Sequence, residues 1–317
     1  MPDAAALCQK IAENVSAAFV GEPSVLAQLL VAVVCRGHIL LEDVPGVGKT
    51  SLVTALARSL DLKYTRIQCT PDTMPSDITG FCMPDRETGE FTYQPGAAMT
   101  QVLLVDEINR TGPKTQSALL QVMQEGAVSV DGVTHRVPEP FIVLATQNPV
   151  EFSGTYPLPE AQLDRFFMRL RLGYPSRENE LDILRRFRTG NTVENLQAVC
   201  KADDITALQA ATDGITVTDV LRNYVVSVIS ATREHPDVAL GISPRGGLAL
   251  LHAACGLALL HGRGYVLPDD VQAMTLPVLS HRMQLTPEAH LRGCATDNVL
   301  ADVIKTIPVP GTGRKVG

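Results

Sequence analysis

The residues best suited to chemistry lie in a glycine-rich stretch near the start of the chain. An apolar run, 39–41, leads into the loop 43–50, and a helix-forming run, 51–60, follows it. This order turns several backbone N–H groups and a helix N-terminus toward one point, which favours an anion. The Lys49 amine would reach the β- and γ-phosphates of ATP, and the Thr50 hydroxyl would bind Mg²⁺. The predicted nucleotide-binding residues are Pro45, Gly46, Val47, Gly48, Lys49, Thr50 and Ser51.

One position departs from the usual phosphate-loop pattern, G-x-x-x-x-G-K-[ST]. Asp43 stands where the first glycine belongs. Aspartate adopts left-handed backbone angles more readily than most residues, so the turn remains possible. A chance glycine-rich turn is the alternative interpretation. The strand signal before the loop and the helix signal after it argue against that alternative.

Two carboxylates follow the apolar run 102–105. Four apolar residues without alternation are typical of a strand buried on both faces of a parallel sheet. Open α/β sheets bind ligands at the carboxyl ends of their strands, where Asp106 and Glu107 would lie. We expect Asp106, with Thr50, to hold Mg²⁺ and Glu107 to polarise the attacking water. Two acids often end a strand by chance, but their place 57 residues after Lys49 favours the catalytic interpretation.

Two further polar residues occupy positions suited to a nucleotide. The run 141–145 predicts a buried strand, and Asn148 follows it, so that its amide could orient water beside Glu107. A plain turn before a proline is the alternative. Arg245 lies in the first turn of a helix opened by Ser243, where the helix dipole disfavours a cation. That position indicates an anionic partner such as a γ-phosphate, although an ordinary surface arginine has the same sequence signature.

The elements that must position these residues predict an α/β fold in two parts. A boundary is expected at Tyr174-Pro175-Ser176, so that 1–174 forms the nucleotide-binding domain and 175–317 a helical lid. A short helix over 160–166 would carry Arg165, and the chain after the helix at 269–281 is expected to be frayed. The predicted strands are 39–41, 64–69, 102–106, 141–145 and 169–172, the last alternating and therefore nearer a sheet edge.

Two polar segments carry hairpin signals. The stretch 70–98 is long for a plain connection, and Phe91-Thr92-Tyr93 within it alternates like a small hairpin arm. The segment 128–137 places Asp131-Gly132 between alternating runs, which is the strongest short hairpin signal. An ordinary surface hairpin is one interpretation of this second segment. A surface that contacts a partner is the other.

Composition restricts the class of protein. The chain has 317 residues, 45% hydrophobic and 19% charged, with a net charge of −7, which argues against a dedicated nucleic-acid binder. Seven cysteines without C-x-x-C spacing indicate free, mostly buried thiols in a reducing cytoplasm rather than disulfides or zinc. We expect no signal peptide and no membrane span, since polar residues interrupt the apolar run 25–41.

Taken together, several motifs resemble the MoxR family of AAA+ ATPases. The resemblance covers about residues 20–285 and extends to the wider helix-2-insert group, which includes magnesium chelatase ATPase subunits and minichromosome maintenance helicases. Aspartate at position 43 is no departure within this family. The segments that carry the resemblance are Glu42–Thr50, Asp106–Arg110, Pro113–Leu120, Ala145–Pro149 and Leu158–Phe166.

The resemblance implies a three-layer αβα domain with a parallel five-stranded sheet, an all-helical lid, and assembly as a ring, usually a hexamer. It makes 79–98 the insert within helix 2 and 127–137 the hairpin before sensor 1. Asn148 would be sensor 1, Arg165 an arginine finger acting on the neighbouring subunit, and Arg245 sensor 2. Lys49, Mg²⁺, Arg245 and a neighbour's Arg165 would together supply positive charge to the γ-phosphate.

The expected function is Mg²⁺-dependent ATP hydrolysis that remodels or activates partner proteins. The family resemblance implies chaperone-like work on protein clients, often with von Willebrand factor A domains, or in metalloprotein maturation. Two alternatives share the same site: a magnesium-chelatase-like motor subunit and a nucleic-acid translocase, which the acidic charge disfavours. A small-molecule kinase is a weaker alternative, because a finger acting in trans and a lid suit a ring.

Overall fold

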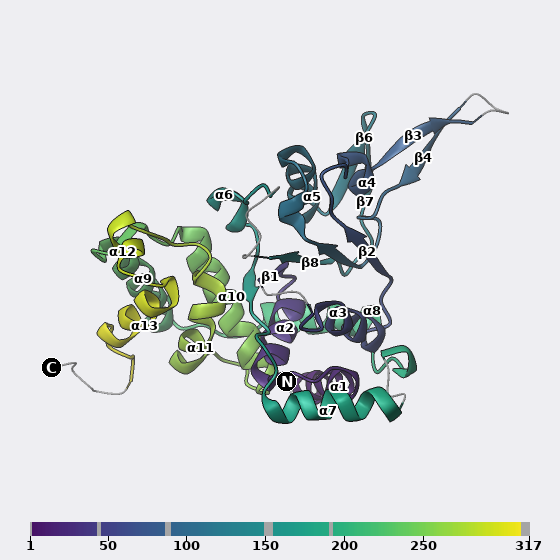
Figure 1. Cartoon of the computed structure of the whole chain (residues 1–317). Coiled ribbons are helices and arrows are strands. Elements are labelled where there is room, and N and C mark those ends of the chain that lie inside the picture. Colours follow the sequence, from purple (N-terminus) through teal and green to yellow (C-terminus); the bar gives the residue numbers. More distant parts are fainter. Residues whose placement is uncertain (1, 43–45, 86–89, 149–154, 190–192, 312–317) are drawn as a thin grey trace.

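The computed structural model describes residues 2–42, 46–85, 90–148, 155–189 and 193–311. The arrangement of the elements is shown in Figure 1. The strands are β1 (Ile39–Glu42), β2 (Tyr64–Gln68), β3 (Gly80–Pro84), β4 (Phe91–Pro95), β5 (Val102–Asp106), β6 (Ala127–Val130), β7 (Val133–Arg136), β8 (Ile142–Gln147), β9 (Met168–Leu170), β10 (Val238–Leu240) and β11 (Gln284–Leu285). The α-helices are α1 (Pro2–Ala18), α2 (Pro23–Val34), α3 (Lys49–Ser59), α4 (Pro75–Thr79), α5 (Pro113–Glu125), α6 (Glu160–Leu163), α7 (Arg177–Thr189), α8 (Ala202–Asp213), α9 (Asp219–Glu234), α10 (Pro244–Leu260), α11 (Pro268–Leu279), α12 (Pro287–Leu291) and α13 (Thr296–Thr306), with 3₁₀ turns η1 (Ile108–Arg110) and η2 (Val193–Asn195).

A five-stranded parallel sheet in the order β2-β5-β8-β1-β9 forms the centre of the first part. The sheet confirms the fold class expected from the apolar runs. The central strands β5 and β8 are buried along almost their whole length, as continuous apolar runs predict. The alternating strand β9 lies at the edge, also as expected. Because all five strands run the same way, their carboxyl ends meet at one edge of the sheet.

Helices cover both faces of this sheet. Side chains of alternate residues point to opposite faces of a strand, so Leu41 and Leu104 pack with Leu56 of α3, whereas Leu40 and Leu103 belong to a second cluster. The second cluster is closed by α5 on the opposite face. Helix, sheet and helix therefore make the three layers that the sequence predicts.

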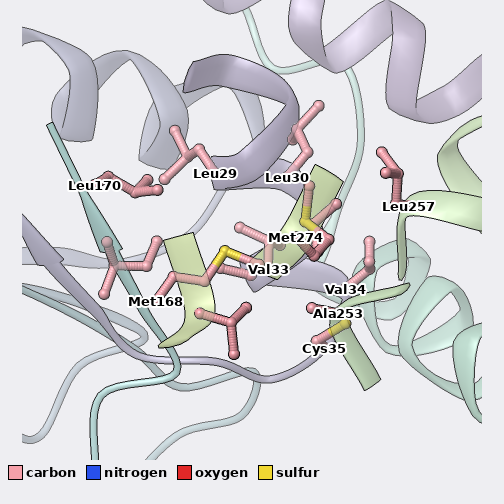
Figure 2. Packing of buried hydrophobic residues seen from close by; sticks show 14 of the residues in the cluster. Leu29, Leu30, Val33, Val34, Cys35, Met168, Leu170, Ala253, Leu257 and Met274 are labelled. Carbon is pink, nitrogen blue, oxygen red and sulfur yellow. The ribbon is translucent and has the colours of Figure 1, made fainter. Parts of the chain in front are cut away.

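The core on the α2–α3 face continues into the lid without a break. Figure 2 shows Leu29 and Val33 of α2 packed among Met168 of β9, Ala253 of α10 and Met274 of α11. The sheet and the lid are thus joined by shared apolar side chains. Within the lid, α10 and α11 form where helices were predicted, after Ser243 and near 269–281, whereas the small antiparallel sheet of β10 and β11 was not predicted.

The expectation of a frayed segment after residue 281 is wrong for 287–306. Two helices, α12 and α13, form there, and Val299, Leu300 and Val303 are buried in the main core. Their spacing of one, three and four residues is a helical stripe, which the sequence analysis overlooked. Residues 312–317 lie outside the described part of the chain.

Two antiparallel hairpins lie beyond the sheet, as predicted, and are seen near α4 and α5 in Figure 1. Strands β3 and β4 form one, and β6 and β7 form the other, with Asp131 at φ 50° and Gly132 at φ 80° in its turn. The Tyr93 ring of the first hairpin stacks on the His135 ring of the second, with centroids 3.9 Å apart. The two hairpins therefore contact one another directly.

Candidate functional site

A cavity of about 340 Å³ lies at the carboxyl ends of the strands. Eight of the predicted site residues line it, together with three that the sequence did not single out. Val47 instead lines a separate small cavity beside Phe19, and Pro45 lies outside the described residues. The residues of the main cavity are Gly46, Gly48, Lys49, Thr50, Ser51, Arg66, Gln68, Asp106, Glu107, Thr146 and Asn148.

The loop that opens α3 has the geometry of an anion cradle. Gly46 and Gly48 both have φ of 87°, a left-handed conformation that residues with side chains rarely adopt. Helix α3 begins at Lys49, so its unpaired first-turn N–H groups lie beside the cavity. A Cβ added at Gly46 would meet no atom within 4 Å, so the approach to this backbone is open. The residues present therefore fit a polyphosphate group.

Asp106 ends β5 as a buried carboxylate, only 7% exposed. Arg66 Nε donates to Asp106 Oδ2 at 2.6 Å, and the Thr146 hydroxyl donates to Oδ1 at 3.2 Å. Thr50 lines the same cavity. Carboxylate and hydroxyl oxygens are the donors that Mg²⁺ prefers, so this set fits the predicted metal. Arg66 shares one Asp106 oxygen and would compete with a cation there.

The Glu107 carboxylate is held from two sides. Gln68 Nε2 donates to Glu107 Oε2 at 2.9 Å, and Arg110 Nε lies 3.0 Å from the same oxygen. The backbone of Glu107 is left-handed, with φ of 56°, and its N–H donates to the Thr146 hydroxyl at 2.8 Å. In this arrangement the predicted base is positioned by neighbours on β2, β8 and η1.

Arg66, Gln68 and Thr146 are the cavity residues that sequence reasoning missed. Arg66 and Gln68 lie two apart on β2 and therefore on the same face of the strand. That spacing was visible in the sequence. The sequence did not reveal that these two side chains lie in the cavity, because their position depends on β2 pairing directly with β5, the strand that carries Asp106.

Asn148 follows β8 by one residue and is buried, with 6% exposure. It lines the cavity with Glu107 as expected. Asn109 Nδ2 lies 3.5 Å from the Asn148 carbonyl oxygen, which ties the two strand ends together. The predicted sensor residue and the predicted base thus line one cavity.

Arg165 and Arg245 lie in a second cavity of about 240 Å³, which none of the described P-loop residues, 46–51, lines. His38, which precedes β1, and Phe167, which precedes β9, also line it. The second cavity therefore lies at the amino ends of β1 and β9, whereas the first lies at the carboxyl ends of β2, β5 and β8 and beside the loop after β1. The structure brings Arg165 and Arg245 together, but it separates Arg245 from Lys49 of the same chain.

The predicted helix over 160–166 is shorter than expected. Helix α6 ends at Leu163, so Arg165 follows the helix rather than belonging to it. Arg282 Nε donates to Asp164 Oδ1 at 2.7 Å, and the Phe166 side chain is fully buried. Burial lowers the pKa of Arg282 to about 10. This anchoring turns the chain into β9 and leaves Arg165 facing the second cavity.

Comparison with known proteins agrees with this geometry. Residues 38–168 match the ATPase family associated with various cellular activities (AAA), and residues 230–303 match the AAA lid domain. MoxR1 of Mycobacterium tuberculosis, which is named a chaperone, is 42% identical over 300 residues, covering 92% of this chain and 79% of MoxR1. The chain belongs to the MoxR family of AAA+ ATPases.

Other relatives of this MoxR-family chain are similar over their full length. YeaC of Bacillus subtilis, named as uncharacterized, is 48% identical over 304 residues, 96% of this chain and 95% of YeaC. MoxR of Paracoccus denitrificans is 33% identical, with 92% of each chain covered. A crystal structure of a candidate ATPase from Cytophaga hutchinsonii is 35% identical with a TM-score of 0.90, covering 97% of this chain and 96% of that one. Among the helices that the structure describes, none has the length and apolarity to cross a membrane.

Proposed function

We propose that this MoxR-family ATPase is cytoplasmic, depends on Mg²⁺, and uses ATP hydrolysis to remodel or activate partner proteins. The observation that carries the proposal is the cavity that joins Lys49, Asp106, Glu107 and Asn148 at one sheet edge. An anion cradle, a buried carboxylate for a metal and a positioned base are the parts that phosphoryl transfer to water requires. We also propose the division into residues 1–174 and 175–317.

The chain's own groups would act by positioning and by moving one proton. The loop N–H groups and Lys49 hold the β- and γ-phosphates, and Thr50 with Asp106 would hold Mg²⁺, which neutralises phosphate charge when bound. Asn148 and Glu107 place the attacking water in line with the bond to be broken. Glu107 accepts the water proton on a carboxylate oxygen, and its contacts to Gln68 and Arg110 both lie on Oε2, which leaves Oε1 to accept it.

The second cavity supports a role in trans for both of its arginines. Arg165 and Arg245 line a cavity at the strand ends opposite to the P-loop, and each would act there on a neighbouring subunit's γ-phosphate. For Arg245 this differs from the prediction from sequence, in which Arg245 and Lys49 of one chain contact the same γ-phosphate. A homo-oligomeric ring, which we propose to be a hexamer, would bring one subunit's arginine cavity to the next subunit's P-loop.

The client is proposed to be a protein, with von Willebrand factor A domain proteins as the first class to test. Support comes from MoxR1, which is named a chaperone. A net charge of −7 gives nucleic acid no general basic surface to bind. A magnesium-chelatase-like motor subunit would use the same cavity, and restored porphyrin metallation with cognate subunits would identify it.

The testing variant is Glu107→Gln. It should bind ATP and assemble but hydrolyse ATP about 10²–10⁴-fold more slowly, the usual scale for a positioned acid–base group. The matched control is Glu125→Gln at the exposed end of α5, which should turn over normally. ATPase assays give the rate, and mass spectrometry of proteins captured by the ATP-trapped variant would identify the client. Near-normal turnover of Glu107→Gln would remove Glu107 from the mechanism.

A further inference from the structure

Four charged side chains link the strand that precedes the P-loop to the lid. Arg171 bridges the two sides: its Nη2 lies 3.0 Å from Glu42 Oε2, and its Nη1 lies 3.1 Å from Asp297 Oδ2. Arg169 repeats the bridge, at 3.2 Å from Glu42 Oε2 and 3.6 Å from Asp297 Oδ1. We call Glu42, Arg169, Arg171 and Asp297 the lid bridge.

The lid bridge joins three elements that are far apart in the sequence. Glu42 is the last residue of β1, and the next described residue, Gly46, already lines the phosphate cavity. Arg169 and Arg171 come from the edge strand β9 and the residue after it. Asp297 lies in the first turn of α13, which packs on α11 within the lid. A displacement of α13 therefore acts on the end of the P-loop strand.

Burial makes this network more than a surface ion pair. The side chains of Arg169 and Glu42 are 13% and 15% exposed, so each charge depends on its partners rather than on water. Burial lowers the pKa of the Arg169 guanidinium, and the Glu42 and Asp297 carboxylates oppose that shift. Two cations are balanced by two anions, and removal of one member leaves a charge without its counterpart.

We propose that the lid bridge makes nucleotide affinity at the P-loop depend on the position of α13, with Arg171 as the positioning residue. The inference rests on the proposed nucleotide site and adds a connection between that site and the lid. Coupling between two sites is reciprocal. If α13 holds the P-loop strand in its binding position, a bound nucleotide must hold α13 in place to the same degree.

The first measurement is ADP affinity by fluorescence titration with Mg²⁺ present. Arg171→Gln should raise the Kd for ADP about tenfold, within the range of coupled sites. Arg171 is 53% exposed, so its replacement should leave the fold intact. Arg58→Gln is the control: it makes the same charge change on α3, where Arg58 donates to the Glu194 carbonyl, and it should stay within about twofold of wild type.

Two further variants separate the effect of the bridge on ADP affinity from the effect of the charge of Arg171 alone. Arg171→Lys keeps the charge but cannot engage two carboxylates at once as a guanidinium does, so its Kd should lie between wild type and Arg171→Gln. Asp297→Asn added to Arg171→Gln should change the Kd by less than Asp297→Asn does alone, since only the Arg169 contact to Asp297 is then left to lose. A full additional effect of Asp297→Asn would show that the two residues act independently and would overturn the proposal.

The reciprocal measurement is amide hydrogen exchange of residues 296–306. Saturating ADP should slow exchange in this helix in the wild type and in Asp302→Asn, a control that breaks only the exposed Asp302–Lys305 pair of α13. ADP should give weaker protection in Arg171→Gln at saturating ligand, because only Arg169 then joins Glu42 to Asp297. Equal protection in Arg171→Gln, or an unchanged Kd, would sink the lid bridge. Failure of the wild type to bind ADP would instead count against the proposed function.

Discussion

Glu107 lies in a backbone conformation that a glutamate adopts only at a cost. A left-handed residue other than glycine is strained by about 1–3 kcal/mol, and such strain is often found at functional sites. In Glu107, with φ of 56°, the hydrogen bond from its N–H to Thr146 helps to maintain this geometry. With this left-handed backbone the Glu107 side chain leaves the strand direction, and its carboxylate contacts Gln68 and Arg110.

The partly buried histidine His38 predicts a pH dependence of stability. Burial lowers its pKa to about 4, from about 6.5 in an unfolded chain. The unfolded state therefore binds the proton more readily, and the free energy of unfolding should fall as pH drops from about 6.5 to 4. The full loss is about 3 kcal/mol for this group. Burial also lowers the pKa of His281, so this residue should reduce stability at low pH in the same way.

Urea unfolding at pH 7, 6 and 5 measures this effect. His38→Gln should be less stable at pH 7, because the imidazole accepts from the Val143 N–H and contacts the Met123 carbonyl. It should also lose part of the pH dependence. His290 is exposed, so His290→Gln should keep the full pH dependence of the unfolding free energy. Equal unfolding free energies for the wild type at pH 7 and pH 5 would contradict the assignment.

Local motifs predicted which residues would meet at one edge of the sheet, and these residues line one cavity. The P-loop glycines, Asp106, Glu107 and Asn148 each follow a recognisable strand, so their meeting place could be inferred from the fold class. Arg66 and Gln68 could not be assigned in this way. Their role depends on the order of the strands, which one sequence does not reveal.

At the scale of elements, strong periodicity and turn chemistry were reliable guides. The Asp131-Gly132 turn predicted the β6–β7 hairpin, and continuous apolar runs predicted β5 and β8. Short elements were harder to predict. Helix α6 ends early because Asp164 is held by Arg282 from the lid, a contact 118 residues away in the sequence. The β10–β11 pair also depends on distant residues.

The β6–β7 hairpin leads to a prediction about coupling. Replacement of residues 131–136 by Gly and Ser should leave basal ATP hydrolysis near wild type, because none of them lines the nucleotide cavity. It should impair client activation, because the hairpin is exposed and the stack of His135 on Tyr93 would be lost. The assay compares ATPase rate with client activation.

A conservative change in the same hairpin supplies the control for this experiment. Thr134→Ser keeps both the hydroxyl and the stacked rings, and should behave as wild type in both assays. If the Gly/Ser replacement activates the client as well as the wild type does, the hairpin is an ordinary surface feature.

At the scale of the whole molecule, the two separate cavities predict complementation between subunits. Arg165→Ala should bind ATP but hydrolyse it about 10³–10⁵-fold more slowly, the scale of an arginine finger. Lys49→Ala should fail to bind ATP tightly. In mixed rings, a Lys49→Ala subunit supplies Arg165 to an intact P-loop of its Arg165→Ala neighbour, and ATPase activity should recover.

The matched control mixes Arg165→Ala with Arg245→Ala. Both arginines line one cavity, so every interface in such rings lacks one of them and activity should stay low. Native mass spectrometry must confirm mixed rings in each case. Confirmed mixed rings of Arg165→Ala and Lys49→Ala without activity would exclude the action in trans. Full activity of Arg165→Ala alone would show that Arg165 is no finger.

The placement of the two cavities at opposite ends of the strands also gives every subunit a direction. One end offers a phosphate site and the other offers arginines, so the two contact surfaces differ, and each copy must meet the next head to tail. Such an interface is heterologous, and it ends either in a closed circle or in an open filament. In a two-fold dimer each copy would present the same end to the other, so that phosphate sites would face phosphate sites or arginines would face arginines. The proposed action in trans therefore requires a head-to-tail order, and the rotation from one copy to the next decides whether that order closes and with how many subunits.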